Sequence, residues 1–265
     1  MSRPAIAILL VMLVLVGCST VPTRFAPADP IPATQFSHQP FDAALRTHVR
    51  DGQVDYPGLA TDARFSAYVQ NLDRLNPDEL RSREDKLAFW INAYNALAIQ
   101  GILIGDSPFT AVGKYRYFIK RTYRVGGGEL NLWGLEHKLL IPLGEPRVHF
   151  AINCASWSCP KLQNSVYLTD GLDGRLEEAA RQFVNDPQRN RFDRERKVAR
   201  LSMIFKWYDD EFEAAAGSVL RYVARYVEDA ALARELEQGG YTVEYLPYDW
   251  SLNGTPPGSA HALAP

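Results

Sequence analysis

A long apolar stripe between Glu84 and Ile104 constrains the fold of this chain more than any other sequence feature. Leu, Ile, Trp and Tyr residues recur there at helical spacing, and they cover a face that is wide for a helix at the surface. The pattern therefore predicts one helix that is central to a hydrophobic core. Gly105 and Pro108 follow the stripe and predict where that helix ends.

Shorter segments predict further helices and strands on both sides of this helix. Helical spacing covers residues 41–49, 65–72, 170–184, 204–212 and 218–238, with another helix after Asn131. Extended segments are predicted at residues 54–56, 115–125, 148–152, 198–201 and 241–246. Because helices and strands follow one another without a regular repeat, we expect an α+β fold: a helix-dominated single domain with a small, mostly antiparallel sheet.

The N-terminus has the order of features of a bacterial lipoprotein signal. Arg3 precedes an unbroken apolar run from Ala5 to Val16, which is shorter than the roughly 20 residues that a helix needs to cross a bilayer. Leu15-Val16-Gly17-Cys18 resembles a lipobox, in which cleavage leaves a lipid-modified cysteine. We therefore expect a signal peptide at residues 1–17, the alternative being a plain secretory signal.

Cys18 is then the expected lipid anchor, and Ser19 favours the periplasmic face of the outer membrane by resemblance to enteric sorting signals. Residues 18–39 are rich in proline and predict a semi-extended tether between the membrane and the domain. The predicted domain covers residues 40–253, and residues 254–265 predict a flexible tail.

Composition limits the function classes that fit this chain. Of its 265 residues, 46% are hydrophobic, and the formal net charge is only −2, which excludes a mainly disordered chain. The balance of 29 basic against 31 acidic residues argues against a strongly basic nucleic-acid binder. We therefore predict no nucleic-acid partner. The predicted partner is a membrane, to which the lipid on Cys18 would attach the protein.

Residues 147–160 contain the strongest candidate site. Residues 148–152 predict a short strand that delivers Cys154 and Cys159 into a loop of small residues. Small residues let backbone N–H groups approach a ligand or a developing oxyanion. Pro160 suits the first position of a helix, which would make Cys159 its N-cap and lower the pKa of that thiol.

Four interpretations of Cys154 and Cys159 remain open on the sequence. A structural disulfide suits an oxidising, exported compartment. A thiol nucleophile needs a base, and His137, beside Glu136 on a short predicted helix, is the candidate. A zinc site would use both cysteines with His137 and His149, but the C-x₄-C spacing is looser than the usual zinc hairpin. The fourth interpretation is a pair of inert buried thiols. We expect no cofactor.

Asn92 and Asn95 share one face of the long predicted helix. Asparagine is unfavourable inside a helix, so two of them among aromatic residues need a specific reason. Either their amides bond buried backbone groups of neighbouring loops, or one of them orients a catalytic imidazole, as in Cys-His-Asn enzymes. Asp249, in an aromatic C-terminal segment, is a further candidate to orient a histidine.

Five motifs together resemble one protein family. They are Phe89-Trp90-Ile91-Asn92-Ala93-Tyr94-Asn95-Ala96-Leu97, Glu136-His137, His149 to Pro160, Phe205-Lys206-Trp207-Tyr208 and Tyr248-Asp249-Trp250-Ser251-Leu252-Asn253. The chain resembles the bacterial lipoprotein branch of the family called domain of unknown function 547, over residues 56–253. The resemblance implies that the cysteine loop and the Glu-His helix are the family signature. It implies no established reaction.

The resemblance also bears on the two cysteines. It implies that Cys154 is the more constant of the pair, because plant members often have Ser where Cys159 stands. This favours Cys154 as the special thiol over a disulfide common to the whole family. Ala155 stands where the family usually has Gly.

We therefore expect a lipid-anchored envelope protein with a papain- or transglutaminase-like thiol hydrolase or acyl transferase site. Cys154 would attack an acyl group of a peptide or envelope substrate, and His137 would carry the proton. Backbone amides near Ala155 and Ser156 would hold the oxyanion. Glu136 points about 100° away from its neighbour on a helix, so we expect an asparagine or Asp249 to orient the imidazole. The alternative is a non-enzymatic envelope binding module with a structural Cys154–Cys159 disulfide.

Overall fold

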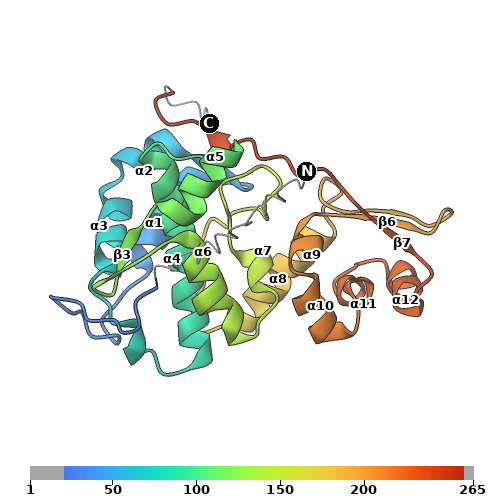
Figure 1. Ribbon diagram of the computed structural model, residues 1–265, viewed down its shortest axis with the longest axis horizontal. Coiled ribbons are helices and arrows are strands. Elements are labelled where there is room, and N and C mark those ends of the chain that lie inside the picture. The colour runs from blue at the N-terminus through green and yellow to red at the C-terminus, as the bar shows by residue number, and fades with distance from the viewer. Residues whose placement is uncertain (1–20, 260–265) are drawn as a thin grey trace, which may run out of the picture.

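Helix α4 (Arg83–Leu103) lies at the centre of the larger part of the molecule, as its apolar stripe predicts (Figure 1). A capping box begins it: the Ser82 hydroxyl accepts from the Asp85 N–H, and the Asp85 carboxylate accepts from the Ser82 N–H. Side chains on all sides of α4 are buried, and Trp90 and Tyr94 are only 4% and 1% exposed. A helix that is apolar all round is one that other elements surround.

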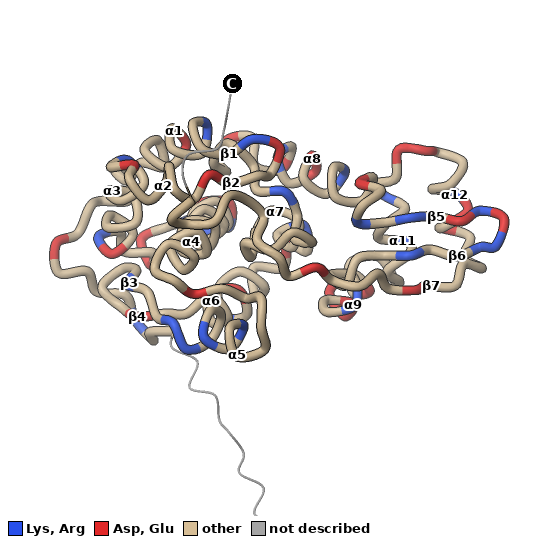
Figure 2. Tube along the Cα trace, turned by 90° about the horizontal axis from the view of Figure 1, so that it is seen from above, with Lys and Arg blue, Asp and Glu red and all other residues tan. Residues whose placement is uncertain are grey.

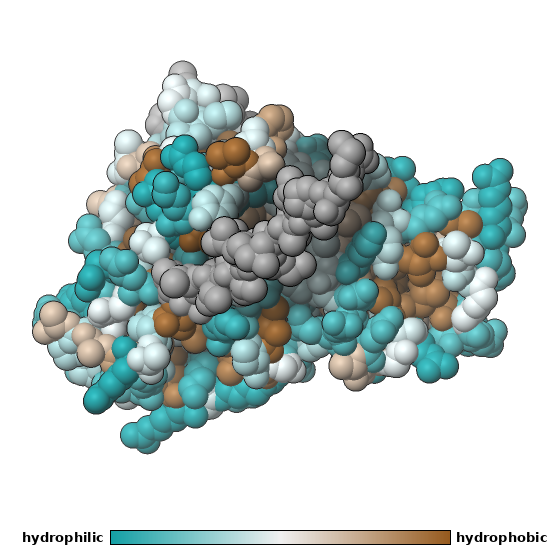
Figure 3. Space-filling model, in the orientation of Figure 1, coloured by the Kyte–Doolittle hydropathy of each residue, from teal (hydrophilic) through white to brown (hydrophobic). Residues whose placement is uncertain are grey.

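The computed structural model describes residues 21–259, which form a larger and a smaller part (Figures 1 and 2). The predicted signal peptide, residues 1–17, and Cys18 lie outside the described residues. No helix within residues 21–259 is long and apolar enough to span a membrane. On the face shown in Figure 3, hydrophilic residues are interrupted by hydrophobic ones over α5 and near β6 and β7.

The other helices surround α4 or build the smaller part. Before α4 come α1 (Gln39–His48), α2 (Tyr56–Thr61), α3 (Ala63–Leu72) and η1 (Pro77–Glu79). After it come α5 (Ala111–Lys114), η2 (Tyr115–Lys120), α6 (Leu132–Gly134), η3 (Leu135–Leu140), η4 (Ile141–Leu143), α7 (Val148–Ala151) and α8 (Leu172–Val184). The smaller part contains α9 (Ile204–Trp207), α10 (Asp209–Ala216), α11 (Val219–Ala224) and α12 (Ala230–Gln238).

The strands of residues 21–259 form three small sheets. The first joins β1 (Val49–Arg50), β2 (Gln53–Asp55) and β8 (Gly254–Thr255); the second joins β3 (Tyr123–Val125) and β4 (Gly128–Leu130); the third joins β5 (Arg191–Asp193), β6 (Val198–Leu201) and β7 (Thr242–Tyr245). The β2–β8 and β6–β7 pairs are parallel and the other three are antiparallel. The helix-dominated α+β prediction is confirmed, with the strands divided among three sheets instead of one.

The segments at the two ends of the predicted domain pack on the body. Phe25, in the predicted Pro-rich tether of residues 18–39, is buried, and its ring centroid lies 5.7 Å from that of Trp90. Ile31 forms a β-bridge with Leu75. At the other end, β8 begins the predicted tail of residues 254–265 and pairs with β2. Proline-rich composition did not reveal these contacts, because single anchoring residues leave no periodic pattern.

Two segments that were predicted as strands are helical. Residues Tyr115–Lys120 form the π-helix η2, so the hairpin predicted over residues 115–125 contains only β3 and β4. Residues Val148–Ala151 form α7. Short apolar runs fit both a strand and a buried helical turn, and tertiary packing decides between them.

Helix α7 joins the two parts of the core. The Phe150 ring stacks on Phe183 of α8 and on Phe212 of α10, with centroids 5.0 and 5.7 Å apart. The next residues, Ala151 and Ile152, pack in the cluster around α4. The loop that carries both cysteines therefore leaves the junction between the two parts.

Candidate functional site

An aromatic cavity of about 510 Å³ lies at this junction. Its wall is built by α4, α5, η2, α6, η3, α7, the cysteine loop, α9 and the C-terminal segment. It brings together five of the predicted site residues: Glu136, His137, His149, Cys154 and Cys159. Asn92, Asn95 and Asp249 do not line it.

Cys154 and Cys159 are joined by a disulfide. The Cys154 Sγ also lies 3.0 Å from the Ser156 Oγ and 3.3 Å from the Tyr248 hydroxyl oxygen. Among residues 21–259, the imidazoles bond to other groups and none is hydrogen-bonded to either sulfur. In this state Cys154 is a cystine sulfur and not a nucleophilic thiolate.

The backbone of the cysteine loop differs from the expected one in two ways. The Ala155 N–H donates to the Asn153 Oδ1 at 2.8 Å, so this amide is not free for an oxyanion. Cys159 is not a helix N-cap, because residues 157–163 contain no helix. Ala155 has φ 61°, in the left-handed region where glycine is favoured. This conformation accounts for the Gly that the resemblance implies at this position.

Asn92 and Asn95 both bond the backbone of neighbouring loops. Asn92 donates to the Tyr167 carbonyl at 2.6 Å and accepts from the Tyr167 N–H at 2.9 Å. Asn95 donates to the Ala151 carbonyl at 3.0 Å and accepts from the Asn153 N–H at 2.8 Å. Each amide thus satisfies one buried carbonyl and one buried N–H, the first of the two alternatives. Asn95 holds the chain directly before Cys154.

Asp249 is exposed and fastens the C-terminal segment over the cysteine loop. Its backbone N–H donates to the Ser158 Oγ at 2.9 Å, and its carbonyl accepts from the Ser158 N–H at 3.1 Å. Its carboxylate accepts from the Ser251 N–H, which holds the pKa of this carboxyl below its usual value. Its flanking residues Tyr248 and Trp250 line the cavity.

His137 is half-buried on η3 and stacks on Trp133, with ring centroids 4.6 Å apart. Its Nδ1 lies 3.0 Å from the Trp133 carbonyl oxygen. Because a carbonyl only accepts hydrogen bonds, we assign the proton to Nδ1. In the neutral ring Nε2 is then an acceptor, on a residue that lines the cavity.

Glu136 and His149 belong to a second, buried polar group with Tyr208 and Glu211. The Glu136 carboxylate, 5% exposed, accepts from the Tyr208 hydroxyl. The His149 Nε2 lies 3.0 Å from the Glu211 Oε1, and its Nδ1 lies 4.0 Å from the Glu136 Oε1. The His149 ring stacks on Tyr208 with centroids 3.6 Å apart. Its Nδ1 is buried and has no hydrogen-bond partner among residues 21–259.

The surroundings of Tyr94 and Tyr208 disfavour ionisation of both hydroxyls. Burial, and next the Glu136 carboxylate, raise the pKa of Tyr94 and Tyr208 well above 10. Both hydroxyls therefore stay protonated and remain donors at neutral pH. The wall of the cavity thus combines tyrosine donors with a buried carboxylate and imidazole nitrogens.

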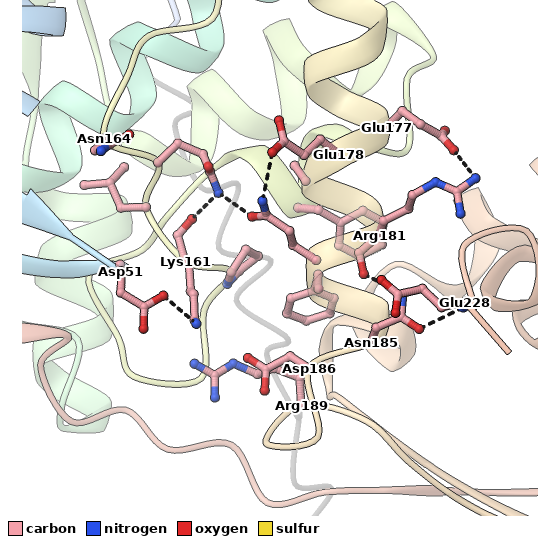
Figure 4. Close-up of a pocket in the computed structure, with 18 of the residues that line it drawn as sticks. Asp51, Lys161, Asn164, Glu177, Glu178, Arg181, Asn185, Asp186, Arg189 and Glu228 are labelled. Atoms are coloured by element: carbon pink, nitrogen blue, oxygen red, sulfur yellow. Dashed lines mark hydrogen bonds and ion pairs between the residues drawn. The ribbon is translucent and has the colours of Figure 1, made fainter. Parts of the chain in front are cut away.

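A second, polar cavity of about 900 Å³ lies along α8 and residues 160–164 (Figure 4). Two ion pairs lie along it: Lys161 with Asp51 at 2.8 Å, and Arg181 with Glu177 at 2.8 Å. Arg189, only 7% exposed, donates to the carbonyls of Trp157 and Cys159 and so braces the cysteine loop from this side. None of the predicted site residues lines this cavity. The aromatic cavity is therefore the candidate site.

No group of three or more His, Cys, Asp and Glu side chains within residues 21–259 is arranged to hold a metal ion.

Residues 77–184 match the family model described as "Protein of unknown function, DUF547". Over these residues the chain belongs to the DUF547 family. The DUF547 segment extends from η1 to the end of α8, so it contains α4, the Glu136-His137 pair and the cysteine loop. No curated protein and no solved structure matches the chain. The lipoprotein branch stays a prediction.

Part of the candidate site lies beyond the DUF547 segment. Tyr208, Glu211 and Arg189 follow it in the chain, and the sequence alone did not assign them to the site. Tyr208 is the last residue of one of the five motifs, and this was the sequence signal that could have assigned it to the site. Arg189 begins a run of mixed charges that is typical of a solvated face. Only the tertiary structure shows that this first member is buried.

Proposed function

We propose that this protein is a lipid-anchored protein of the bacterial cell envelope, held through Cys18 at the periplasmic face of the outer membrane. We further propose that its aromatic cavity binds an amphiphilic ligand, which has an apolar body and a head that donates hydrogen bonds. The observation that carries this second proposal is the pair of buried acceptors, Glu136 and His149 Nδ1, at the wall of an otherwise aromatic cavity.

The lining of the cavity supports this ligand class. Trp133, Trp207, Trp250 and Phe118 give it the apolar, aromatic surface that receives hydrocarbon. Because the Glu211 carboxylate accepts from the His149 Nε2, the Nδ1 of the neutral ring is a buried acceptor without a donor. Such an atom costs free energy, and a ligand that supplies the donor recovers it. An ammonium or hydroxyl head meets this requirement, whereas an anionic head is repelled by the Glu136 carboxylate.

The disulfide has a structural role in this proposal. It closes the loop that forms one wall of the cavity, and Arg189 and Asp249 hold this loop from outside. An exported protein meets an oxidising compartment, where such a bond persists. A closed loop keeps the cavity preformed, which lowers the entropic cost of binding.

Binding of a single-chain amphiphile tests the ligand class. We expect dodecylamine to bind below its micellar concentration more tightly than dodecyl sulfate, measured by calorimetry. Glu136→Gln should remove most of the preference, and Glu129→Gln, at an exposed position on β4, should keep it. Equal affinity of the two amphiphiles, or no binding of either, would contradict the proposal.

A thiol acyl transferase or hydrolase is the second candidate function, because one cavity contains Cys154, His137 and His149. A dithiol reductant would first convert the cystine to two thiols while its own sulfurs become a disulfide. His137 would take the proton of the Cys154 thiol, and the resulting thiolate would attack an acyl carbonyl to form a thioester, while the leaving group departs with the proton that His137 returns. Water, for a hydrolase, or an acceptor nucleophile, for a transferase, would then cleave the thioester and regenerate the thiol.

Alkylation by iodoacetamide, read by mass spectrometry, separates the two functions. The binding module predicts no labelling of Cys154 without a reductant. The thiol enzyme predicts rapid labelling at pH 6 after reduction, with the rate lost in His137→Ala. Labelling after reduction only above pH 8, unaffected by His137→Ala, would exclude an activated thiol.

Fractionation tests the anchor. We expect the intact protein to sediment with outer membranes and to carry lipid on Cys18, and Cys18→Ser to prevent this modification. Recovery of the intact protein without lipid would contradict the proposed anchor, and it would not affect the proposal about the cavity.

A further inference from the structure

An apolar stripe is exposed on α5, on η2 and on Phe109, which shortly precedes α5. Phe109, Val112, Tyr115 and Ile119 are 66%, 71%, 55% and 40% exposed. They follow one another at spacings of three, three and four residues, so they lie on one side of the helical segment. A contiguous group of large exposed apolar residues marks an interaction surface.

Basic residues accompany this stripe. Lys114 and Lys120 form no ion pair within residues 21–259, and Lys114 lies over the Trp250 ring at 3.9 Å. Arg116 and Arg121 share the single buried carboxylate of Asp106, at 3.2 and 2.5 Å, so these three carry one net positive charge. Figure 2 shows blue segments gathered along the edge that α5 and α6 form. Apolar and basic residues together are typical of a surface that lies on anionic lipid.

The described chain begins beside this surface. Val21 packs directly on Gly134 of α6, where any side chain larger than hydrogen would clash with it, and α6 packs on η2. Cys18 precedes Val21 by three residues, which span at most about 11 Å. The proposed lipid on Cys18 would therefore hold this side of the molecule against the membrane, a step that rests on the proposed anchor.

We infer that the α5–η2 surface, defined by Phe109, Val112, Tyr115 and Ile119 together with Lys114 and Lys120, lies on an anionic lipid bilayer. The same element forms one wall of the aromatic cavity, through Tyr115, Phe118 and Ile119. The cavity therefore adjoins the proposed lipid surface, with which it shares Tyr115 and Ile119. An amphiphile then passes from the bilayer to the cavity without crossing water.

Vesicle flotation tests this surface independently of lipidation. A chain that begins at Ser19 contains every described residue and lacks the anchor. We expect it to float with vesicles of equimolar phosphatidylglycerol and phosphatidylcholine, to bind pure phosphatidylcholine at least tenfold more weakly, and to lose affinity as salt is added. Absence of binding to the anionic vesicles would overturn the inference, whether or not Cys18 is lipidated.

Two variants and two matched controls locate the contact. Lys120→Glu should weaken binding about 30-fold, since each basic charge near an anionic surface contributes about fivefold. Val112→Ser with Ile119→Ser should weaken it at least tenfold.

Arg50→Glu, exposed on β1 at the opposite edge in Figure 2, and Leu168→Ser, 52% exposed, should change binding less than threefold. Thermal melts establish that each variant is folded. Equal losses in variants and controls would overturn the inference.

Discussion

At the scale of single residues, side-chain amides decide the geometry of the candidate site. Asn95 connects α4 to the two backbone groups that flank Ile152, and Asn153 in turn accepts from Ala155 and donates to the Pro160 carbonyl. A chain of amides therefore runs from the central helix to both ends of the cysteine loop. Such a network is stable only when every buried member has a partner.

Replacing Asn95 by Ala should lower the free energy of unfolding by about 2–4 kcal/mol, because it leaves the Ala151 carbonyl and the Asn153 N–H buried without partners. Urea denaturation measures this loss. Asn164→Ala, at an exposed position, is the control and should change stability by less than about 0.5 kcal/mol. Similar urea midpoints for Asn95→Ala and for the unchanged protein would show that water takes over the hydrogen bonds of the Asn95 amide.

Ala155→Gly should stabilise the protein by up to about 1 kcal/mol. Its φ of 61° strains an L-residue, whereas glycine adopts this conformation freely. The gain is reduced by the larger entropy of glycine in the unfolded chain. The same denaturation experiment measures it. A loss above 1 kcal/mol would mean that burial of the Ala155 methyl outweighs the strain.

At the scale of elements, α4 organises the larger part because its neighbours pack on every side of it. Phe25, from a segment without periodicity, packs on Trp90, and Phe89 packs edge-on against the same ring at 4.8 Å. Residues 21–38 are thereby a structural element of the body, although they contain no helix or named strand.

Truncating Trp90 to Ala should cost about 3–5 kcal/mol, the usual range for large core aromatics. Phe25→Ala should cost a comparable amount if the N-terminal segment belongs to the core. Trp157→Ala, at a side chain that is 38% exposed, is the matched surface control. A cost below 1 kcal/mol for Trp90→Ala would place α4 outside the core, and the same result for Phe25→Ala would show that its segment does not belong to the core.

At the scale of the whole molecule, the free energy of unfolding should decrease at acidic pH because His38 is buried. Burial lowers the pKa of His38 from 6.5 to about 4, and its Nδ1 lies 2.7 Å from the Tyr68 hydroxyl oxygen. Between these two pH values the unfolded chain binds a proton that the folded chain does not bind. The contribution to stability is therefore complete above pH 6.5 and decreases as the pH falls toward 4.

We expect the free energy of unfolding to fall by about 1–2 kcal/mol between pH 7 and pH 5 because of this group. Urea denaturation at several pH values measures the slope. His38→Gln should flatten it within this window, while the loss below pH 4, where carboxylates such as Asp62 with its lowered pKa become protonated, should persist. An unchanged slope in His38→Gln would assign the pH dependence to other groups.

Local signals in the sequence were enough to predict the helical class, the central helix and several boundaries. Asn131 caps α6 by accepting from the Gly134 N–H, and Gly105 directly follows the C-cap of α4. The sequence predicted both, because caps and helix ends depend on residues that are close in sequence. The resemblance likewise identified the motifs that meet in the aromatic cavity. Family membership of residues 77–184 confirms it over that segment.

The tertiary structure alone decided which polar groups meet. Glu136 contacts Tyr208 and His149 instead of orienting His137, and Glu211 reaches His149 from α10. Residues this far apart in sequence share no spacing rule, because their contact depends on how α7, η3 and the smaller part pack. The turns of η2 and α7 were decided in the same way: their composition fits a strand as well as a helix, and burial against neighbouring elements selected the helix.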